Sequence, residues 1–315
     1  MIYWIATRGH AYTLEKHLAH FGRMLVGNVS VQDYRFLHQS NLPVGTYILA
    51  DIERLSETEI ARYDNIVGGL VANGSVVLNR PGKVKRRYEL LTGLANQGMN
   101  EFRVFREAEV DNCKTFPVFL RCENDHNGSL SGLLRSREEL QRAIEQQSRT
   151  RMLFHDEQRV WRWFRSGPKR KQQLLVTEFC DTSDCDGVFR KYSAFIVDGT
   201  VIPRHLFFGK SWMLKAPELK SRQQLLAEEL EYVRCNPHAM QLKQIFGFAN
   251  IDYGRIDYGL KNSRVQTWEI NTNPMITTPD DARGIDRLAV QEMFVAKFHA
   301  ALQSALRCQS SAVAA

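Results

Sequence analysis

The sequence has no long apolar stretch. No segment approaches the run of about 18 apolar residues that marks a membrane-spanning helix, so no such helix is expected. The opening segment, MIYWIATRGHAYTLEKH, lacks a basic region followed by a long apolar segment, and a secretory signal is not expected. Internal repeats and low-complexity linkers are also missing. For 315 residues, these features indicate a cytoplasmic protein of about two domains or one multi-part enzyme.

Cysteine is sparse, with 6 residues in the whole chain. Their spacing matches no zinc-site pattern, and reduced thiols packed in a cytosolic protein are expected. As an alternative, Cys180 and Cys185 could form a disulfide or a redox pair, although C-x4-C by itself is a weak signal. No serine or cysteine nucleophile motif is recognisable, which fits a reaction that needs no side-chain nucleophile.

Positive charge is in excess. Lysine and arginine number 42 against 35 acidic residues, which gives a net charge of +7 and a pI near 9.1. Such a balance favours anionic partners such as nucleotides, acidic substrates or nucleic acid. The basic run GPKRKQQ, residues 167–173, is too short to establish a nucleic-acid site and is expected to be a solvated loop. A nucleic-acid partner therefore rests on net charge alone.

Strand and helix patterns alternate in residues 1–79. Ser56 and Glu59 form the S-x-x-E pattern of a capping box, and Gly74 suits the C-terminal end of the same helix. Strands are expected in IYWIAT, GTYILADI and SVVLN, with helices in TLEKHLAHFGRML and SETEIARYDNIVGGLVANG. This order predicts a Rossmann-like α/β lobe with a parallel sheet.

Residues 80–308 carry mixed elements, and residues 309–315 form an expected frayed tail. Asp198 and Gly199 mark a hairpin turn. Strands are expected in FRVFREAEV, FPVFLRCEND, QQLLVTEFCD, KYSAFIVDGTVIPRHLFF, FANIDYGRIDYG and RVQTWEINTNP. Helices are expected in KVKRRYELLTGLANQG, SREELQRAIEQQ, KSRQQLLAEELEYVRCN and RGIDRLAVQEMFVAKFHAALQSALRC. The last helix also offers a surface for a homodimer.

Polar residues gather in GRIDYGLKNSRVQTWEINTNP. Glu269 and Asn271 are alternate residues of one expected strand and share a face, as Arg255 and Asp257 do on the other. If the strands pair antiparallel, two carboxylates and an amide oxygen converge beside an arginine. Hard oxygen ligands suit magnesium, and arginine suits phosphate. The alternative is that these side chains form the exposed polar faces of edge strands.

The two motifs resemble the ATP-grasp superfamily, in which an R-x-D strand is followed by E-x-N-x-x-P. The resemblance implies an ATP-grasp region with central and C-terminal subdomains after an N-terminal α/β domain. It also implies that Asp257, Glu269 and Asn271 bind Mg²⁺ ions that bridge the phosphates of ATP. Arg255 would contact phosphate and the developing charge on the transferred group.

Earlier segments extend the resemblance. FPVFLR resembles the strand that ends in an ATP-binding lysine, but Arg121 stands at that position. Arginine keeps the charge and can grip phosphate bidentately, although it is bulkier. HNGSLSG resembles the loop that folds over the phosphates, which implies that backbone N–H groups of Gly128, Ser129 and Ser131 cradle anionic oxygens. A bare glycine turn is the plainer alternative.

LLVTEFCD resembles the strand that leads into the adenine hinge. The resemblance places Glu178 at the hinge entrance and gives the adenine edge to the backbone of Phe179 and Cys180. Lys191 occupies the position where many relatives carry a glutamate that holds the ribose. Asp184 or Asp186, in the preceding loop, would then substitute for that glutamate.

NRPGKVKRRYELL resembles the segment that sends a basic residue to the nucleotide before the central domain. Lys83 and Lys85 are the candidates, with exposed lysines near a helix start as the alternative. Arg204 and His205 lie on opposite faces of an expected strand, where one could face the phosphates or bind an acceptor carboxylate. For His205, a satisfied structural histidine is the preferred interpretation.

The implied reaction activates a carboxylate as an acyl phosphate and joins it to an amine or another nucleophile. The acid would be a small molecule or a peptide. The alternatives are a kinase-like phosphotransferase that uses the same nucleotide site, and a non-catalytic nucleotide-binding protein. The departures at Arg121 and Lys191 favour the non-catalytic reading, and the complete set of Asp257, Glu269 and Asn271 opposes it.

Overall fold

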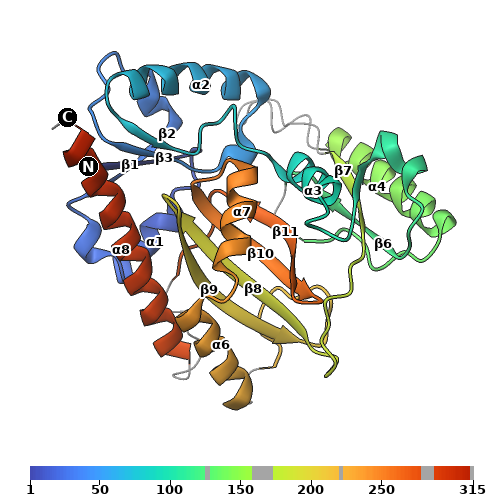
Figure 1. Ribbon diagram of the computed structural model, residues 1–315. Coiled ribbons are helices and arrows are strands. Elements are labelled where there is room, and N and C mark those ends of the chain that lie inside the picture. Colours follow the sequence, from blue (N-terminus) through green and yellow to red (C-terminus); the bar gives the residue numbers. More distant parts are fainter. Residues whose placement is uncertain (125–127, 158–172, 220–222, 278–286, 313–315) are drawn as a thin grey trace. The chain divides into compact units, whose positions relative to one another are not determined.

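The computed structural model describes residues 1–124, 128–157, 173–219, 223–277 and 287–312. The chain forms two compact units (Figure 1). The first unit joins Met1–Arg86 to Thr182–Ala315, and the second unit is Arg87–Asp181. The division predicted at residues 79 and 80 follows sequence order, whereas the first unit combines both ends of the chain. Within the described residues, no helix is long and apolar enough to cross a membrane.

A parallel sheet opens the first unit, as the alternating pattern predicted. Its strands are β1 (Ile2–Ala6), β2 (Val29–Asp33), β3 (Thr46–Leu49) and β4 (Val76–Leu78), in the order β2-β1-β3-β4. Strand β2 was missed in the sequence. It lies at the sheet edge, and only Val29 among its residues is fully buried, so its hydrophobic signal is weak.

Helices cover this sheet. They are α1 (Tyr12–His20) and α2 (Glu57–Ala72), with short 3-10 turns at Arg23–Leu25, Tyr34–His38 and Ile52–Arg54. The capping box of α2 is confirmed, since Ser56 Oγ accepts from the Glu59 amide and the Glu59 carboxylate accepts from the Ser56 amide. Gly74 follows α2 at φ +84°, a left-handed conformation that glycine adopts without strain. Helix α1 ends earlier than predicted, at His20.

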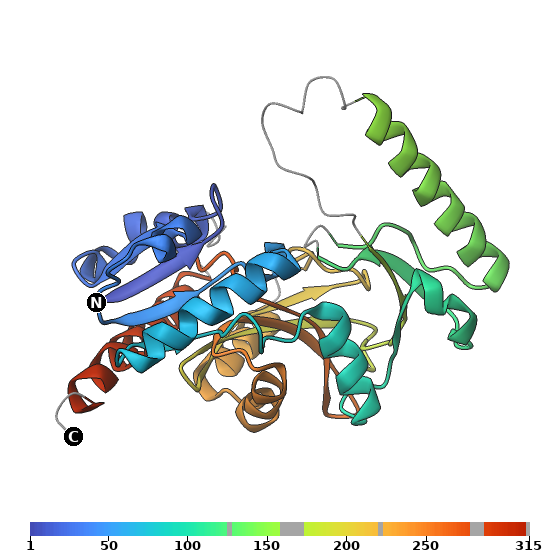
Figure 2. The ribbon, with the colours of Figure 1, turned by 90° about the horizontal axis from the view of Figure 1, so that it is seen from above.

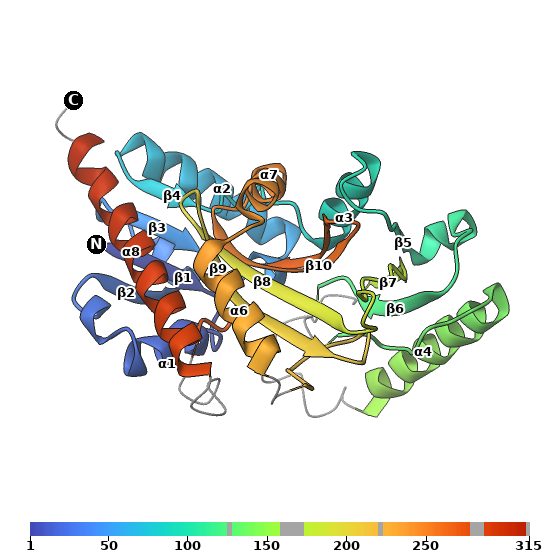
Figure 3. The ribbon, with the colours of Figure 1, turned by 60° about the horizontal axis from the view of Figure 1, so that its bottom comes forward.

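An antiparallel sheet forms the other part of the first unit (Figure 3). Its strands are β8 (Phe189–Val197), β9 (Thr200–Gly209), β10 (Tyr253–Lys261) and β11 (Arg264–Asn271), in the order β11-β10-β8-β9. The predicted hairpin between β8 and β9 turns at Asp198 and Gly199, both with positive φ. Figure 3 shows β8, β9 and β10 side by side, and in the strand order β10 lies between β8 and β11.

Three helices pack around this sheet: α6 (Gln223–Cys235), α7 (Ala239–Ala249) and α8 (Leu288–Ala312). Helix α7 was missed, and its last residues had been assigned to the strand that begins at Tyr253. Helix α8 continues to Ala312, so residues 309–312 are helical rather than a frayed tail. Phe294 and Phe298 of α8 join Trp4 of β1 and Phe195 of β8 in one core, which ties the two sheets together.

The second unit is built on a three-stranded antiparallel sheet. Its elements are α3 (Arg87–Asn96), β5 (Val104–Arg106), β6 (Val118–Cys122), α4 (Arg137–Glu157) and β7 (Leu174–Glu178), with a 3-10 turn at Glu107–Asn112 and the strand order β5-β7-β6. Helix α4, green in Figure 2, packs on the sheet through Leu140, which joins Leu120 and Val176 in the core. The predicted serine cap is present, as Ser136 Oγ accepts from the Glu139 amide.

The cysteines whose side chains are described form no disulfide bond with one another. Cys113 and Cys122 are buried, Cys180 is half-buried, and Cys185 and Cys235 are exposed. Cys180 and Cys185 therefore form no disulfide in this structure.

Candidate functional site

Strands β10 and β11 pair antiparallel, as the sequence predicted. Arg255 lies directly opposite Asn271, and Asp257 lies directly opposite Glu269. Directly opposed residues of an antiparallel pair share a face, and alternate residues of one strand do so as well. The four polar side chains therefore belong to one face of the sheet.

The row extends across the two remaining strands. Ser193 on β8 is the register partner of Asp257, and His205 on β9 is the register partner of Ser193. One line across the sheet thus carries His205, Ser193, Asp257 and Glu269. Lys191 lies two residues before Ser193 on β8, so both side chains are on the same face of the sheet. The sequence did not reveal Ser193, and it named Lys191 only through the resemblance and not as a partner of Asp257, because both places depend on the pairing of β8 with β10.

Asp257 is the most tightly held member of the row. It is 2% exposed. Arg255 Nε lies 2.9 Å from Oδ1 and Lys191 Nζ 2.8 Å from Oδ2, and Ser193 Oγ donates to Oδ1 at 2.5 Å. Burial alone would raise the pKa of Asp257, but the positive charges of Arg255 and Lys191 outweigh it and hold that pKa far below its usual value. The carboxyl group is therefore ionised.

The donor set can be tested against magnesium. Two carboxylates and an amide oxygen are hard ligands of the right kind. Both oxygens of Asp257 already contact Arg255 or Lys191, so a dication at this carboxylate would take the place of those contacts. No group of three His, Cys, Asp or Glu side chains suited to a metal occurs in the described ranges. With Asn271 as a third oxygen ligand and water or phosphate as the others, the donor types suit Mg²⁺.

The segment after β11 fixes the position of Asn271. Asn271 Oδ1 accepts from the Asn273 amide at 2.7 Å. Between them, Thr272 donates its amide to Glu53 at 2.7 Å and its hydroxyl to the same carboxylate at 2.6 Å. Asn273 in turn accepts from Thr13 Oγ1 of α1 at 2.5 Å. The N-terminal lobe therefore anchors the E-x-N-x-x-P segment, a role that the sequence did not reveal.

The prediction that Arg204 and His205 lie on opposite faces of the strand is wrong. The register of β8 and β9 shifts between Ser193 and Ala194, which places Arg204 in a β-bulge where strand alternation fails. Arg204 Nε donates to the Ile276 carbonyl at 2.8 Å, and the guanidinium lies 4.8 Å from the Phe294 ring centre. His205 stacks on Phe207 with 3.8 Å between ring centres. Both residues line a cavity of about 310 Å³ next to Arg255 and Asp257.

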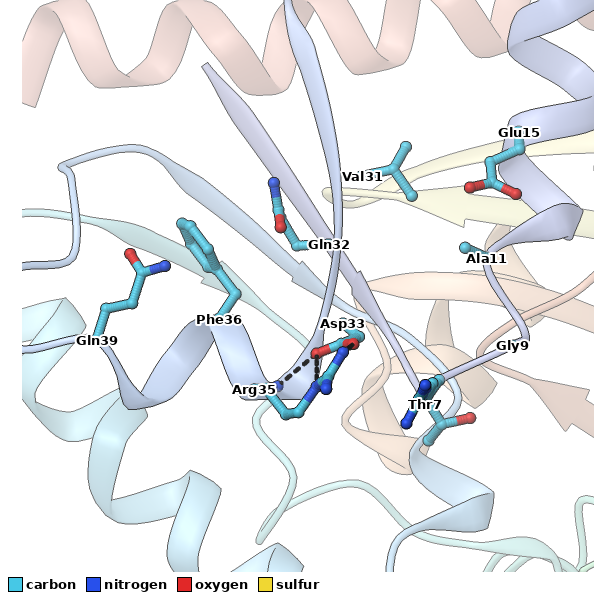
Figure 4. Close-up of a pocket in the computed structure, with 11 residues that line it drawn as sticks. Thr7, Gly9, Ala11, Glu15, Val31, Gln32, Asp33, Arg35, Phe36 and Gln39 are labelled. Atoms are coloured by element: carbon cyan, nitrogen blue, oxygen red, sulfur yellow. Dashed lines mark hydrogen bonds and ion pairs between the residues drawn. The ribbon is translucent and has the colours of Figure 1, made fainter. Parts of the chain in front are cut away.

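A second cavity, of about 510 Å³, lies at the carboxyl ends of β1 and β2 (Figure 4). Its lining includes Thr7, Gly9, Asp33, Arg35 and Phe36. Arg35 is already paired with Asp33, as the dashed lines in Figure 4 show. The sequence prediction missed this cavity, although the carboxyl ends of parallel strands are where α/β sheets commonly bind ligands.

The second unit holds the predicted phosphate-binding residues. Arg121, on β6, is 8% exposed and forms an isolated bridge to Ser129, so the loop after β6 folds back on that strand. Ser129 Oγ accepts from the Ser131 amide at 3.2 Å, and Ser131 Oγ accepts from the Leu120 amide at 3.0 Å. Gly128 adopts φ +92° at the start of the loop. The loop is therefore held by its own serines, and the amide of Ser131 is already engaged.

The predicted hinge follows β7. Glu178 is buried, and its carboxylate accepts from the Arg103 amide at 2.8 Å. The Phe179 amide donates to the Pro117 carbonyl at 2.9 Å. That N–H already has a partner within the second unit. The prediction that the backbone of this segment binds the adenine edge therefore depends on Cys180 and on the carbonyl groups.

The other predicted nucleotide residues belong to the first unit. Asp184 and Asp186 are exposed, and both pair with Arg190, at 3.6 and 3.0 Å. Lys83 is exposed in the turn before α3. Lys85 is half-buried, with Nζ 4.9 Å from the Phe248 ring centre. All but the last residue of the basic run 167–173 lies outside the described residues.

Comparisons with known proteins identify the fold. No protein-family model matches the sequence, and no curated protein sequence matches it. The structure of a D-alanine–D-alanine ligase from Bacillus anthracis is similar, with a TM-score of 0.51 and 13% identity over 99% of each chain. The structure of the ATP-grasp ligase PsnB, solved with a minimal precursor, has a TM-score of 0.50 and 10% identity over 94% of this chain and 99% of that chain. The chain has the ATP-grasp fold.

The ATP-grasp fold confirms what the R-x-D and E-x-N-x-x-P motifs implied about architecture. At these identities the likeness concerns the fold alone. The ligand roles of Arg255, Asp257, Glu269 and Asn271 stay predictions, supported by the geometry of the first unit.

Proposed function

We propose that this ATP-grasp protein is an ATP- and magnesium-dependent ligase that joins a carboxylic acid to an amine or another nucleophile. The observation that carries the proposal is the buried, ionised Asp257, set between two cations and opposite Glu269. Buried carboxylates whose pKa is strongly shifted by neighbouring charges are common at functional sites. The two similar structures are both of ligases, which supports this reaction class.

The metal-binding roles are assigned to Asp257, Glu269 and Asn271. Magnesium, when bound, neutralises charge on the phosphates and polarises them toward a nucleophile. Arg255 and Lys191 bring two positive charges to the same face of the sheet and stabilise negative charge there. Ser193 holds the Asp257 carboxylate in a fixed orientation through its hydroxyl.

Two chemical steps account for the ligase reaction. A carboxylate oxygen of the acid bonds to the γ-phosphorus of ATP, the bond to the bridging oxygen breaks, and ADP leaves. The acyl phosphate is then attacked at its carbonyl carbon by the amine, which loses a proton, and phosphate leaves. Arg255 stabilises the charge that develops on oxygen in both steps. No side-chain nucleophile takes part.

Nucleotide binding is assigned to both units. Arg121, with the loop that carries Gly128, Ser129 and Ser131, would hold phosphate, because a buried arginine and a glycine-containing loop suit that ligand. The remaining assignments follow the sequence prediction: Glu178, Phe179 and Cys180 at the hinge, Asp184 or Asp186 at the ribose, and Lys83 and Lys85 as candidates for the basic residue that contacts the nucleotide. The cytoplasmic location and the homodimer also stay predictions.

The test is ADP release from the purified chain with candidate acids and amines, with products read by mass spectrometry. A ligase releases ADP and phosphate in stoichiometric amounts only when both substrates are present. Glu269→Gln should abolish this turnover, because it removes a ligand charge without changing size. Glu292→Gln, at an exposed position on α8, is the matched control and should behave like the wild type.

Two other results would redirect the assignment. A stable phosphorylated product formed without any amine would identify a phosphotransferase. Nucleotide binding without ADP release, for every acid and amine tested, would favour a non-catalytic nucleotide-binding protein. Full activity of Glu269→Gln would remove that residue from the metal site.

A further inference from the structure

Arg287 lines the cavity of about 310 Å³ and is held there by a buried partner. Its Nε and Nη2 donate to the Glu229 carboxylate of α6, at 3.0 and 2.5 Å. Glu229 is 2% exposed and also accepts from the Leu206 amide at 3.1 Å. Because β9 is an edge strand, this amide points away from the sheet and toward α6. The guanidinium is therefore fixed at the outer edge of β9.

Part of the Arg287 guanidinium is available to a ligand. A guanidinium carries five N–H donors in a rigid planar fork. Nη1 makes no hydrogen bond to any described residue, and the side chain keeps 13% of its surface exposed. The N–H groups that Glu229 does not use can hold a second carboxylate bidentately, which is the geometry that arginine favours.

His205 is a second group of this cavity whose hydrogen-bonding capacity is unused. Its side chain is 7% exposed, and the imidazole makes no hydrogen bond to any residue in the described part of the chain. It is therefore not the satisfied structural histidine that the sequence favoured. Burial lowers the pKa of His205 well below its usual value, with help from the charge of Arg204, so the ring is neutral. A neutral imidazole offers one donor and one acceptor.

Phe207 orients both groups. Its ring centre lies 3.8 Å from that of His205, with 5° between the planes, and 5.0 Å from the Arg287 guanidinium carbon. Phe207 and His205 are alternate residues of β9 and share a face of the sheet. Arg287, His205 and Phe207 are here called the Arg287 subsite. Since buried polar groups almost always find a partner, a ligand is expected to supply the partners that this subsite lacks.

The charge of the described cavity lining favours an anion. Its two carboxylates, Asp257 and Glu229, are already paired with cations. The cations of the lining are Lys191, Arg204, Lys215, Arg255 and Arg287. A cavity with this excess of positive charge attracts anionic ligands.

The Arg287 subsite is separate from the proposed magnesium ligands. His205 on β9 and Asp257 on β10 lie on either side of Ser193 on β8. Neighbouring strands are about 4.8 Å apart, so these two positions are roughly 10 Å apart across the sheet. Arg287 lies beyond His205, at the outer edge of β9. One carboxylate group is too small to contact Arg287 and the proposed magnesium ligands at once.

We infer that the Arg287 subsite binds a carboxylate that does not react, so that one substrate carries a carboxylate in addition to its reacting group. Arg287 holds this carboxylate, and His205 forms a hydrogen bond with a polar group of the same molecule nearer to Asp257. Such a substrate is a dicarboxylic acid or an amine that itself carries a carboxylate. This inference rests on the proposed ligase function, and it names the chemical class of one substrate of that site.

The experiment compares five-carbon probes that differ only at one end. Glutarate is compared with pentanoate, and 5-aminopentanoate with pentylamine, by calorimetry on the full chain without nucleotide. In at least one pair, the probe with the additional carboxylate should bind about tenfold more tightly or better, because hydrogen bonds to charged groups are strong. A preference for glutarate identifies a dicarboxylic acid, and a preference for 5-aminopentanoate identifies a carboxylate-bearing amine.

Variants of Arg287 test the origin of this preference. Arg287→Lys keeps a cation beside Glu229 but removes the planar fork, and the preference should fall several-fold. Glu229→Gln combined with Arg287→Met removes the ion pair without leaving a buried charge, and the preference should disappear. Arg234→Lys is the matched control, because Arg234 is an exposed arginine of α6 paired with Glu231, and it should bind like the wild type. Thermal unfolding of each variant verifies that it is folded.

His205→Phe tests the histidine. It keeps a flat ring that can stack on Phe207 but removes both nitrogens, so the favoured probe should bind several-fold more weakly. An unchanged affinity would remove His205 from the subsite. Equal affinities within both pairs, no binding of any probe, or a preference that survives in the double variant would overturn the inference. Displacement of the favoured probe by Mg²⁺ and a non-hydrolysable ATP analogue would also overturn it, since the subsite would then bind nucleotide phosphate.

The two proposals fail separately. If the favoured probe binds through Arg287 but no acid and amine together release ADP, the ligase function fails and the carboxylate subsite stands. If ADP release occurs with an acid and an amine that carry no additional carboxylate, and neither pair of probes shows a preference, the ligase function stands and the inference fails.

Discussion

Lys191 Nζ lies 2.8 Å from Oδ2 of Asp257, across the paired strands β8 and β10. Many ATP-grasp relatives carry an acid at the position of Lys191, according to the resemblance in the sequence. Here a lysine stands there and, together with Arg255, surrounds a carboxylate that is almost fully buried. An isolated buried charge is strongly unfavourable, so each of the two cations helps to keep Asp257 ionised.

Replacing Lys191 should therefore destabilise the fold. Lys191→Met keeps the length of the side chain but removes its charge. Leaving a buried ion with no partner costs roughly 3–5 kcal/mol, and because Arg255 and Ser193 remain, we expect a loss of about 2 kcal/mol. Urea unfolding at neutral pH measures the change. Lys191→Arg, which keeps the charge, should lose much less, and equal losses for the two variants would rule out the ion pair as the cause.

A histidine pair predicts how stability depends on pH. His17 Nε2 of α1 lies 2.9 Å from His299 Nε2 of α8, and both side chains are buried. Burial, and then the charge of His299, lower the pKa of His17 to about 4. In the unfolded chain the pKa is about 6.5, so the unfolded state binds the proton first as pH falls. The stability is fully present above about pH 6.5 and is lost progressively toward pH 4.

The size of this loss of stability follows from the difference between the folded and unfolded pKa of His17. A difference of about 2.5 pH units at about 1.4 kcal/mol per unit gives about 3–4 kcal/mol in total. The free energy of unfolding should thus drop between pH 7.5 and 4.5 by about 2–3 kcal/mol more in the wild type than in His17→Gln. His20→Gln, at an exposed position on the same helix, is the control and should keep the wild-type pH dependence. A parallel pH dependence in His17→Gln would contradict the assignment.

Short-range patterns explain the parts of the site that could be predicted. Strands β10 and β11 are consecutive, with a tight turn at Asn262 and Ser263, so strand alternation placed Asp257 and Glu269 on one face without any tertiary information. The capping box of α2 is also local. The partner of Asp257 on β8 could not be found in this way. Helices α6 and α7 separate β8 from β10 in the chain, and the register of such a pair is set by the folded sheet.

The cavity of about 310 Å³ next to Arg255 and Asp257 could not be predicted from the sequence for the same reason. His205, Leu225 and Met275 come from a strand, a helix and the segment after β11, and no local pattern brings them together. Strand β2 and helix α7 were missed because their own sequence patterns are ambiguous. The first is a short edge strand with mostly polar residues, and the second ends immediately before an apolar run that looks like a strand.

The α2 capping box provides a local stability test. Ser56→Ala removes the hydroxyl that accepts from the Glu59 amide at 3.3 Å. Loss of an N-cap serine typically costs about 1 kcal/mol, and we expect that decrease in the free energy of unfolding. Ser40→Ala, at an exposed position, should change it by less than about 0.5 kcal/mol. Indistinguishable losses in the two variants would show that the box contributes nothing to stability.

Thr272 links stability to Asn271, one of the proposed metal ligands. It is fully buried, donates to Glu53, and accepts from the Ile52 amide at 3.0 Å. Thr272→Val has nearly the same shape but leaves the buried Glu53 carboxylate and the Ile52 amide each short of one hydrogen bond. We expect a loss of about 2 kcal/mol, since unsatisfied buried groups of this kind cost roughly 1–3 kcal/mol. Urea unfolding measures it.

The same substitution should weaken the response to magnesium. Thr272 directly follows Asn271, so loosening its anchor shifts the amide oxygen that is proposed as a ligand. In Thr272→Val, the magnesium concentration for half-maximal ADP release should rise several-fold, because displaced ligands bind a metal with strict geometry less well. Thr272→Ser, which keeps the hydroxyl, should restore most of the stability and the metal response. Thr200→Val, the same exchange at an exposed position, should change neither. If Thr272→Val lost stability but kept the wild-type magnesium dependence, Asn271 would not depend on this anchor.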